Sequence, residues 1–592
     1  MTDPKRLFDF PYYQLEKYPQ NKALNTKYNG TWKATSTQEY IDKANAISRA
    51  LISMGVKPND KVALISTNNR TEWNICDIGI MQTGAQDVPI YPTISESEYE
   101  YVLNHSESLY CFVSDKEVYD KVMAIKANVP SLKEVYTFDE IEGAKNWSEV
   151  LEKGKDESNQ DELDKRKEAI NEDDATLIYT SGTTGRPKGV MLSHKNIATN
   201  AKFSAERLPI DLGKSSSLSF LPVCHIYERM LHYMYQYCGV EIYFAESLET
   251  ISDNLKEVKP EVMTAVPRLL EKVYDKIYAK GADLTGIKKK LFFWSVELGL
   301  KYEPYGENGW WYESQLKLAN KLIFSKWREA LGGNLKAIAS GSAPLQPRLA
   351  RVFNAAQIPV MEGYGLTETS PVVSVNDMRN NGFKIGTVGK PLKETEVKIA
   401  EDGEILVKGP QVMLGYYKNQ EQTDEVIKDG YFHTGDIGEI DSEGFLKITD
   451  RKKEMFKTSG GKYVAPQVIE NVMKQSRFIE QMMVIGEGEK MPAALIQPDF
   501  EFLKEWGNKK GRNLSSDPKE IIKNQAVIDR IQKEVDFYNE KFGHWEKVKK
   551  FELTPEVWSI EGGQLTPTMK MKRKVIKEQY KDMYNKIYGH NF

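Results

Sequence analysis

Short apolar runs alternate with helix-length segments between Lys61 and about Pro267. Each run is long enough for one buried strand: KVALIST (61–67), LYCFVS (109–114), ATLIYT (175–180) and VEIYFAE (240–246). Strands separated by helical segments favour βαβ units. The pattern therefore predicts an α/β fold built on largely parallel sheets.

The pattern changes between residues 384 and 449. The runs TEVKIA, GEILVKG and GFLKIT are short and are joined by Gly and Asp turns, which is typical of a small antiparallel β unit. After Asp450, about 140 residues mix strand and helix signals and are long enough for a separate domain. We predict one domain over 1–449 and another over 450–592.

Composition and charge narrow the classes of protein that need to be considered. Apolar residues make up 40% of the 592 residues, and the four cysteines form no CxxC pair, which fits a globular protein in a reducing compartment. The net charge of −4 gives no general attraction to nucleic acid. No signal-peptide pattern is present, and no apolar stretch approaches the roughly 18 residues that span a bilayer. We expect a soluble cytoplasmic protein, with contact at a membrane surface left open.

The segment TLIYTSGTTGRPKGVML (176–192) carries the strongest chemical signal. Two apolar strands enclose a loop whose glycines bring backbone N–H groups close to a ligand, whose hydroxyls add donors, and whose Lys188 adds a positive charge. The loop residues concerned are Thr180, Ser181, Gly182, Thr183, Thr184, Gly185 and Gly189. Together they suit a polyphosphate. Lys188 is followed by Gly and a strand, so this is not a Walker A loop; a polar hairpin turn is the plain alternative.

YTSGTTGRPKGV resembles the phosphate-binding loop of the adenylate-forming (AMP-binding) superfamily, which includes acyl-CoA synthetases, luciferases and the adenylation domains of peptide synthetases. Further matches follow in order along nearly the whole chain. The resemblance implies ATP, Mg²⁺ and coenzyme A as cofactor and co-substrates. It also implies a large N-terminal domain of two parallel-sheet α/β subdomains plus a small β-barrel. A small mobile α+β C-terminal domain would follow, with a hinge within Asp450–Lys453.

Two more segments resemble parts of the family's nucleoside site. The loop after LKAIAS resembles the adenine-contacting loop, because small residues let a flat ring lie against the backbone. Its members are Gly341, Ser342, Ala343 and Pro344. Asp436 in YFHTGD resembles the ribose ligand, since an ionised carboxylate has acceptor sites for both hydroxyls of a cis-diol. On the residues alone, ordinary glycine turns stay open as explanations.

YGLTET (364–369) resembles the segment that spans adenine and phosphate in this family. Tyr364 and Gly365 are expected at the adenine, and Thr367 is expected at the α-phosphate. Glu368 offers a hard oxygen ligand for Mg²⁺, with Thr184 as a second ligand. A capped helix start is the structural alternative.

DRKKEMFKTSGGKYVAP (450–466) resembles the hinge and first strands of the family's mobile domain. Arg451 is expected to reach the ribose or a phosphate. Lys457, Ser459 and Gly460 match the face that the family presents while the thioester forms. Without the resemblance, this charge run reads as a solvated turn.

TPTMKMKR (566–573) resembles the element that carries the adenylation lysine. The match falls on Lys570, and Lys572 stays open as an alternative. The Thr-Pro-Thr form is typical of long-chain enzymes and replaces the Ser-Gly of many short-chain members. A basic surface helix is the plain alternative.

LPVCHIYERM (221–230) resembles the motif that lines the acyl site in the long-chain branch. His225 is expected near the fatty carboxylate, with a packed core histidine as the alternative. Arg229 stands where one branch has a tryptophan gate, so that gate is not implied. The aromatic-rich segment 285–333 is similar to an insertion of long-chain enzymes and fits a tunnel wall, ordinary core or a membrane-facing patch.

The resemblance as a whole implies a long-chain fatty-acid–CoA ligase. It would join fatty acid and ATP into acyl-AMP, releasing pyrophosphate, and then transfer the acyl group to CoA. The residues expected to act in catalysis are Lys188, His225, Thr367, Glu368, Lys457 and Lys570. Two alternatives stay open: a ligase for aromatic acids or a carrier protein, and a non-catalytic protein that binds nucleotide or lipid. No nucleic-acid partner is expected, and chain-length preference and oligomeric state are left open.

Overall fold

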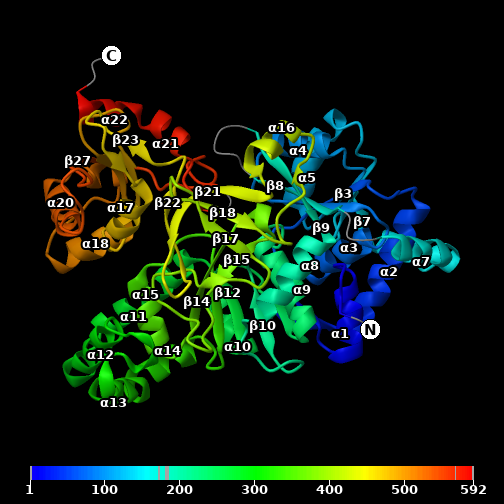
Figure 1. The fold of residues 1–592 in the computed structure, drawn as a ribbon, viewed down its shortest axis with the longest axis horizontal. Coiled ribbons are helices and arrows are strands. Elements are labelled where there is room, and N and C mark those ends of the chain that lie inside the picture. The colour runs from blue at the N-terminus through cyan, green and yellow to red at the C-terminus, as the bar shows by residue number, and fades with distance from the viewer. Residues whose placement is uncertain (1–2, 171–173, 181–185, 567–568, 590–592) are drawn as a thin grey trace. The chain divides into compact units, whose positions relative to one another are not determined.

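Two large β-sheets form the framework of the first part of the chain (Figure 1). The computed structural model describes residues 3–170, 174–180, 186–566 and 569–589. The chain divides into two compact units. The first comprises Met1–Lys398, Leu406–His433 and Asp441–Leu446, and the second comprises Ile399–Ile405, Thr434–Ile440 and Lys447–Phe592. Both large sheets belong to the first unit.

Within the described residues, one of these sheets has nine strands. In sheet order they are β16 (Lys390–Pro391), β15 (Val372–Val375), β14 (Val360–Gly365), β13 (Ala337–Ser340), β12 (Val262–Ala265), β10 (Ser216–Ser219), β11 (Glu241–Phe244), β1 (Leu24–Tyr28) and β2 (Thr31–Thr35). The neighbours β14, β13, β12 and β10 are parallel. Their carboxyl ends therefore lie along one edge of the sheet.

The other large sheet has eight strands among the residues that the structure describes. In sheet order they are β19 (Gly415–Tyr416), β9 (Lys188–Ser193), β8 (Asp174–Thr180), β4 (Gln86–Ile90), β3 (Lys61–Ile65), β5 (Tyr110–Val113), β6 (Glu134–Thr137) and β7 (Lys145–Asn146). The sheet is parallel from β8 to β7. β8 and β9 form an antiparallel hairpin in which Thr180 pairs with Lys188, and β19 pairs antiparallel with β9.

Helices α3 (Thr71–Met81) and α9 (Ile226–Cys238) lie between the two sheets. All eleven residues of α3 and nearly all of α9 are buried, so each needs cover on opposite sides. On α9, Glu228 bonds to side chains of β10 and β12 in the nine-stranded sheet. The next residue, Arg229, bonds to side chains of β4 and β8 in the eight-stranded sheet. Consecutive residues of one helix thus join both sheets.

Other helices cover the outer faces. α4 and α5 pack on the eight-stranded sheet, and α10, α11, α12, α13, α14 and α15 share a core with the nine-stranded sheet. The bounds of these and the remaining helices of the first unit are α1 (Asp9–Lys17), α2 (Thr37–Ser53), α4 (Glu96–Ser106), α5 (Lys116–Ile125), α6 (Trp147–Lys153), α7 (Gln160–Ala169), α8 (His194–Ala205), α10 (Ile251–Val258), α11 (Pro267–Ala282), α12 (Gly286–Gly299), α13 (Gly309–Ala319), α14 (Ser325–Ala330), α15 (Pro347–Ala355) and α16 (Gln420–Val426).

A third sheet corresponds to the small β unit predicted after residue 384. In the described chain its order is β17–β18–β21–β20, with β22 paired to β21. The strands are β17 (Glu396–Ile399), β18 (Glu404–Lys408), β20 (Ile427–Lys428), β21 (Tyr431–Ile440) and β22 (Leu446–Arg451). β20 and β21 are antiparallel, as expected for strands joined by a Gly turn.

The second unit is built on a sheet with helices on both faces. β25 (Ile479–Ile485) and β26 (Ala493–Pro498) are antiparallel, and β27 (Lys550–Leu553) runs parallel to β26. Alternate residues of β26 belong to two different core clusters, one shared with α17, α18 and α20 and the other with α21 and α22. The remaining bounds are β23 (Phe456–Lys457), β24 (Tyr463–Val464), α17 (Pro466–Met473), α18 (Phe500–Lys509), α19 (Pro518–Ile521), α20 (Gln525–Asn539), α21 (Arg573–Gln579) and α22 (Lys581–Tyr588).

The predicted fold class is confirmed: parallel-sheet α/β layers, a small β unit and a small α+β part follow one another along the chain. The four apolar runs of the first half are the strands β3, β5, β8 and β11. The boundary at 449/450 and the mobility of the C-terminal domain stay predictions. None of the helices in the described residues has the length and apolar character needed to cross a bilayer.

Arg229 is fully buried beside two carboxylates. One of its terminal nitrogens lies 2.6 Å from an oxygen of Asp77 and 2.9 Å from an oxygen of Asp87, and the other donates to Thr176 Oγ1 at 2.6 Å. Burial raises the pKa of Asp87 to about 7, against the opposing attraction of Arg229. One cation facing two carboxylates is electrically balanced when one carboxyl holds a proton. At the position where one branch of the family has a tryptophan gate, this chain therefore has a core ion cluster.

Glu228 takes part in a buried chain of hydrogen bonds. Its Oε1 lies 2.6 Å from Ser219 Oγ, which lies 2.9 Å from His232 Nε2, and His232 Nδ1 lies 2.9 Å from Asn74 Oδ1. Asn74 uses its amide nitrogen elsewhere, so Oδ1 must accept and Nδ1 must carry a hydrogen. Burial lowers the pKa of His232 to about 3, so its Nε2 accepts from the Ser219 hydroxyl, and Glu228 must then donate to Ser219. Burial accordingly raises the pKa of Glu228 to about 7.

Glu228→Gln tests this protonated network. Because the folded-state pKa of Glu228 is raised, its contribution to the free energy of unfolding falls as pH rises from about 4.5 to about 7. The lowered pKa of His232 acts in the opposite sense up to pH 6.5. Glu228→Gln removes the pH dependence that comes from Glu228 and keeps the one that comes from His232. Relative to the wild type it should therefore gain up to roughly 3 kcal/mol across that pH window, as measured by denaturant unfolding.

The control for this experiment is Glu307→Gln, which changes an exposed carboxylate of the same unit. That substitution should leave the pH trend of the wild type unaltered. A difference between Glu228→Gln and the wild type that stays constant from pH 4.5 to 7 would contradict a proton on Glu228.

Candidate active site

Three of the predicted segments lie at one edge of the nine-stranded sheet. β10, β13 and β14 are parallel and end at Ser219, Ser340 and Gly365. The His225 segment follows the first strand, the loop of Gly341 the second and the turn of Glu368 the third. Ligands of open α/β sheets bind outside the carboxyl ends of the strands. The structure thus gathers the predicted acyl, adenine and phosphate segments where a ligand is expected.

The turn after β14 is tightly built. A Cβ on Gly365 would lie 1.8 Å from the carbonyl oxygen of Pro371, so this position admits no side chain. Thr369 Oγ1 donates to the same carbonyl at 2.5 Å, which closes the turn across the start of β15. The short helix η5 (Thr367–Thr369) results, with Thr367 buried and Glu368 half-buried. The backbone around Thr367 and Glu368 therefore fixes the two residues that are predicted to bind the α-phosphate and Mg²⁺.

Tyr416 joins two of the predicted residues, Lys188 and Glu368. Its hydroxyl donates to Glu368 Oε1 at 3.0 Å, and Lys188 Nζ lies 5.0 Å from the centroid of its ring. β19 pairs with β9 so that Tyr416 lies opposite Val190, and the N–H of Met413 donates to the carbonyl of Glu368 at 2.8 Å. Tyr416 is 6% exposed. A cation, a ring and a carboxylate therefore form one compact group.

Tyr416 is the site residue that the sequence analysis missed. The run MLGYYKN has no loop or charge signature, and either tyrosine could face the site. Only the antiparallel pairing of β19 with β9 decides that Tyr416 points to Glu368, while Tyr417 packs its ring on His105. Residues 48 positions apart meet here, so no local pattern could have found the contact.

The loop between β8 and β9 is described only at its two ends. Thr180 closes β8 opposite Lys188, so the hairpin brings the predicted hydroxyl and cation together. The predicted residues Ser181, Gly182, Thr183, Thr184 and Gly185 lie outside the described residues. Their roles at the phosphates, and that of Thr184 at Mg²⁺, stay predictions.

His225 and Gly341 meet through Tyr227. His225 is the N-cap of α9, and its side chain accepts a hydrogen bond of 3.1 Å from the N–H of Tyr227. The Tyr227 ring lies 3.4 Å from where a Cβ on Gly341 would be. Ser342, the next residue, takes a left-handed backbone conformation with φ of 71°. His225, predicted to lie near the fatty carboxylate, and the predicted adenine loop are thus neighbours.

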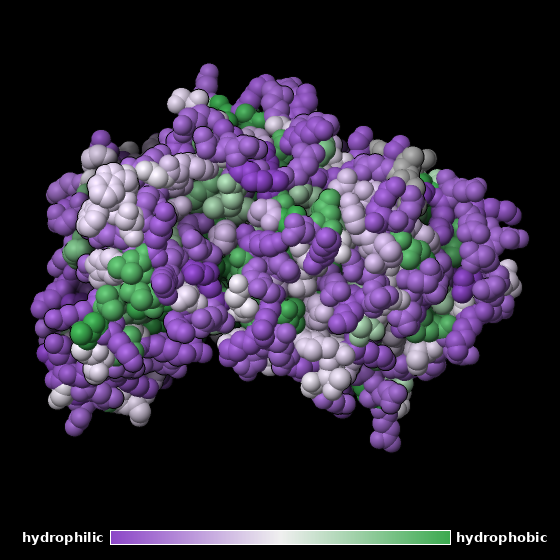
Figure 2. All heavy atoms as spheres, turned by 90° about the horizontal axis from the view of Figure 1, so that it is seen from below, coloured by the Kyte–Doolittle hydropathy of each residue, from purple (hydrophilic) through white to green (hydrophobic). Residues whose placement is uncertain are grey.

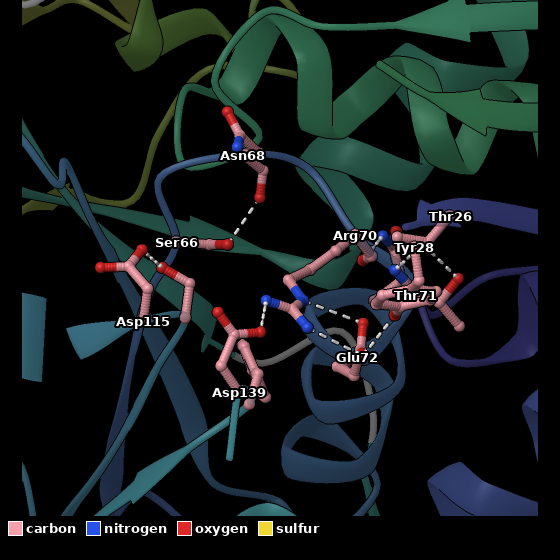
Figure 3. A network of polar contacts seen from close by, with 12 residues as sticks. Thr26, Tyr28, Ser66, Asn68, Arg70, Thr71, Glu72, Asp115 and Asp139 are labelled. Atoms are coloured by element: carbon pink, nitrogen blue, oxygen red, sulfur yellow. Dashed lines mark hydrogen bonds and ion pairs between the residues drawn. The ribbon is translucent and has the colours of Figure 1, made fainter. Parts of the chain in front are cut away.

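The loop after β3 ties the carboxyl edges of the two large sheets together. Asn69 Nδ2 donates to Ser219 Oγ at 2.8 Å, and its Oδ1 accepts from a backbone N–H of the loop that follows β10. Figure 3 shows the adjoining residues: Arg70 makes two bonds of 3.0 Å to Glu72 and one of 2.9 Å to Asp139. The segment that leads to His225 is therefore held from both sheets.

In the second unit, Asp436 and Arg451 form an ion pair. Arg451 Nε lies 3.1 Å from Asp436 Oδ1, and Asp436 is only 5% exposed. Burial raises the pKa of the neighbouring Asp450 to about 7, and the N–H of Arg451 donates to its carboxyl at 2.6 Å. The predicted ribose ligand and the predicted hinge arginine are thus direct partners within this unit.

Lys457, Ser459 and Gly460 lie at the hairpin of β23 and β24. Lys457 is exposed, and its Nζ lies 4.5 Å from the centroid of the Tyr463 ring across the hairpin. The N–H of Ser459 donates to the carbonyl of Glu489 at 2.8 Å. Lys457, Ser459 and Gly460 thus belong to a hairpin turn that is held by backbone hydrogen bonds and that exposes the Lys457 side chain.

Lys570 and Lys572 differ in their settings. Lys570 is exposed on a turn, where its N–H donates to Thr566 Oγ1 at 3.0 Å and its carbonyl accepts from the N–H of Thr566 at 2.8 Å. Lys572 is half-buried and precedes the first residue of α21. The exposed turn at Lys570 suits a side chain that reaches a ligand.

The first unit offers suitable protein ligands for magnesium nucleotide. In the part of the chain that the structure describes, no three His, Cys, Asp or Glu side chains converge as a metal site. Mg²⁺ bound with a nucleotide takes most of its ligands from phosphate and water and needs only one or two protein oxygens. Glu368 Oε1 accepts from Tyr416, and Oε2 makes no hydrogen bond to any described residue. The residues present therefore fit the metal that ATP carries.

Comparisons with known proteins agree along nearly the whole chain. The AMP-binding enzyme family matches residues 12–417, and the AMP-binding enzyme C-terminal domain matches residues 454–591. A long-chain-fatty-acid–CoA ligase of Mycobacterium bovis is 35% identical over 95% of this chain and 93% of its own. The peroxisomal long chain acyl-CoA synthetase 7 of Arabidopsis thaliana is 32% identical over 98% of this chain and 85% of its own.

Solved structures show the same fold. The fatty acyl CoA synthetase of Mycobacterium tuberculosis matches with a TM-score of 0.64 and 21% identity, over 98% of this chain and 99% of that one. An anthranilate CoA ligase in complex with anthranoyl-AMP matches with a TM-score of 0.71 and 19% identity, over 98% of each chain.

The chain therefore belongs to the adenylate-forming family of AMP-binding enzymes. Within that family it is a member of the long-chain acyl-CoA synthetase branch, whose named members match it over most of its length.

Proposed function

We propose that this chain is an AMP-forming long-chain fatty-acid–CoA ligase. It joins a fatty acid to ATP as acyl-AMP with release of pyrophosphate, and it then transfers the acyl group to CoA with release of AMP. The observation that carries the proposal is the gathering of Lys188, Glu368, His225 and the Gly341 loop at strand ends. Named ligases 31–35% identical over most of the chain support the same activity.

The first half-reaction brings two anions together. The carboxylate of the fatty acid attacks the α-phosphorus of ATP, so the barrier comes largely from charge repulsion and alignment. Lys188 and the amides and hydroxyls of 180–185 offset phosphate charge, and Thr367 donates to the α-phosphate. His225 orients the attacking carboxylate. Mg²⁺, when bound at Glu368 and Thr184, neutralises charge on the phosphates.

Residues of the second unit serve the two half-reactions in turn. Lys570 supplies a cation to the phosphate during adenylation, and Asp436 and Arg451 hold the ribose. Lys457 with Ser459 and Gly460 serves the attack of the CoA thiol on the acyl carbon. A rotation of the C-terminal domain at Asp450–Lys453 would let one pocket run both steps under different electrostatics. No covalent enzyme intermediate is required.

Tyr416 positions the carboxylate of Glu368. Its hydroxyl fixes one oxygen of that carboxylate, and its ring lies beneath the Lys188 ammonium. Without it, a carboxylate and an ammonium in the same site would attract each other directly and would compete with magnesium and phosphate. We place Tyr416 as a positioning residue for the magnesium nucleotide.

Substrate specificity is tested with the purified chain, ATP, Mg²⁺ and CoA. Palmitate should give palmitoyl-CoA, AMP and pyrophosphate in equal amounts. 4-Coumarate, or an acyl carrier protein in place of CoA, should give rates lower by on the order of 100-fold. Faster turnover of 4-coumarate or of the carrier would assign the other ligase class, and absence of pyrophosphate with every acid would indicate a non-catalytic binder.

Lys570→Ala should separate the two half-reactions. Pyrophosphate formation should fall by on the order of 100-fold, because one cation is lost where phosphate charge develops. Conversion of supplied palmitoyl-AMP and CoA to palmitoyl-CoA should stay near the wild-type rate. Lys572→Ala is the matched control and should keep both rates. An equal loss of both half-reactions in Lys570→Ala, or a selective loss of adenylation in Lys572→Ala, would refute the assignment.

Tyr416→Phe should raise the KM for magnesium ATP by about tenfold, because a hydrogen bond to a charged group is lost while the ring is kept. Thioester formation from supplied palmitoyl-AMP should not change, since that step uses no magnesium ATP. Tyr417→Phe removes the neighbouring hydroxyl and should leave both quantities unaltered. An unchanged KM in Tyr416→Phe would exclude the positioning role.

Location and membrane contact form a separate part of the proposal. We place the reaction in the cytoplasm, with peripheral contact at a membrane surface. The support for that contact comes from the helical segment 285–333.

A further inference from the structure

The outer face of α13 and of the short π-helix η4 (Asn320–Phe324) that continues it is unusually apolar. Four large hydrophobic side chains are exposed there: Trp310 (78%), Trp311 (64%), Leu318 (49%) and Leu322 (43%). We call these four residues the α13 face. Residues 311, 318 and 322 recur at helical spacing and so lie on one side of the helix. Figure 2 shows hydrophobic side chains gathered at the left of the view from below, where Figure 1 places α12 and α13.

The adjacent side of the same helix is firmly packed, so the α13 face is not exposed by fraying. Tyr312, Leu316, Ala319 and Phe324 belong to the core shared with the nine-stranded sheet. The Tyr312 hydroxyl also donates to the carbonyl of Leu298 in α12 at 2.8 Å. The helix is therefore apolar on two adjacent sides, and only one of them is buried within the chain. A surface of this kind marks an interaction site.

Charges around the α13 face select one class of partner. Lys317 and Lys321 are exposed on the side of the helix that carries Trp310, next to the side of Leu318 and Leu322. The neighbouring α12 begins with the exposed Ile287 (76%), followed by the exposed lysines 288–290. Tryptophan and lysine around an apolar stripe are typical of an element that lies in the interface of an anionic bilayer. A second copy of the same face would oppose lysine to lysine.

We propose that the α13 face docks the chain on an anionic lipid bilayer, with the tryptophans among the headgroups and Lys317 and Lys321 at lipid phosphates. The proposal gives the peripheral contact a defined surface. It does not depend on ligase activity, because binding to vesicles is measured without turnover. Each of these lysines adds to attraction toward an anionic surface, and the attraction is screened by salt.

Sedimentation of the full chain with lipid vesicles tests this surface. The wild type should bind vesicles of phosphatidylcholine with phosphatidylglycerol and should bind pure phosphatidylcholine vesicles more weakly. The double variant Trp310→Ser/Trp311→Ser should lose at least tenfold in partition to both. Lys317→Glu/Lys321→Glu should lose binding to the anionic vesicles selectively, and high salt should reduce wild-type binding in the same way.

Phe537→Ser is the matched control, because Phe537 is a large hydrophobic residue that is 66% exposed on α20 of the second unit and does not belong to the α13 face. This variant should partition like the wild type. Partition of the tryptophan variant equal to that of the wild type would overturn the proposal. A second result would also overturn it. If, in the absence of lipid, the tryptophan variant had a lower sedimentation mass than the wild type, the α13 face would be assigned to contact with a second copy of the chain. Circular dichroism and thermal unfolding of each variant distinguish loss of the surface from loss of the fold.

Discussion

The placement of α9 between two sheets is the constraint on which the rest of the first unit depends. Successive residues on a helix point about 100° apart, so two neighbours can reach opposite layers. Glu228 bonds to the nine-stranded sheet, and Arg229 bonds to the eight-stranded sheet. Both are fully buried, and a buried charge or proton is stable only with its partners in place. A shift of either sheet along α9 would leave Glu228 or Arg229 buried without its partners. These contacts therefore hold both sheets at one position along the helix and so in one register.

This register is what gives the site its geometry. His225 begins α9, so its position follows from that of the helix, and Asn69 holds the preceding loop from the eight-stranded sheet. The carboxyl ends of both sheets therefore meet at fixed distances before any ligand binds. A reaction between two anions gains most from groups placed in advance, because their reorganisation then costs nothing at the transition state. We therefore propose that the polar core at α9 supports catalysis indirectly, by fixing the positions of the residues at the sheet edges.

The parts of this arrangement that could be predicted from sequence are the local ones. Apolar runs gave β3, β5, β8 and β11, and short motifs marked the segments at Lys188, Glu368 and Lys570 because small, charged and hydroxyl residues stand close together there. The contacts that organise them are not local. Arg229 reaches Asp77 across 152 residues, and Tyr416 reaches Glu368 across 48. No periodicity encodes such pairs, and a buried arginine or a strand tyrosine looks ordinary in its own segment.

The exposed apolar side of α13 is relevant to how a protein that joins a lipid to a nucleotide would meet its two substrates. The segment 285–333 was open to reading as tunnel wall, core or membrane-facing surface, and the structure buries one side of α13 in the core while the adjacent α13 face stays exposed. A long-chain acid partitions into lipid, whereas ATP and CoA are anions that an anionic bilayer repels within a Debye length of about 8 Å. An enzyme for both kinds of substrate gains if its lipid-facing surface is not its nucleotide-facing edge. Here α13 packs with the helices on the outer face of the nine-stranded sheet. The cluster of Lys188, Tyr416 and Glu368, which is predicted to bind the magnesium nucleotide, lies at strand ends. The first unit thus carries its exposed apolar surface and its predicted nucleotide-binding residues on different elements, a separation that suits an enzyme that joins a lipid to a nucleotide.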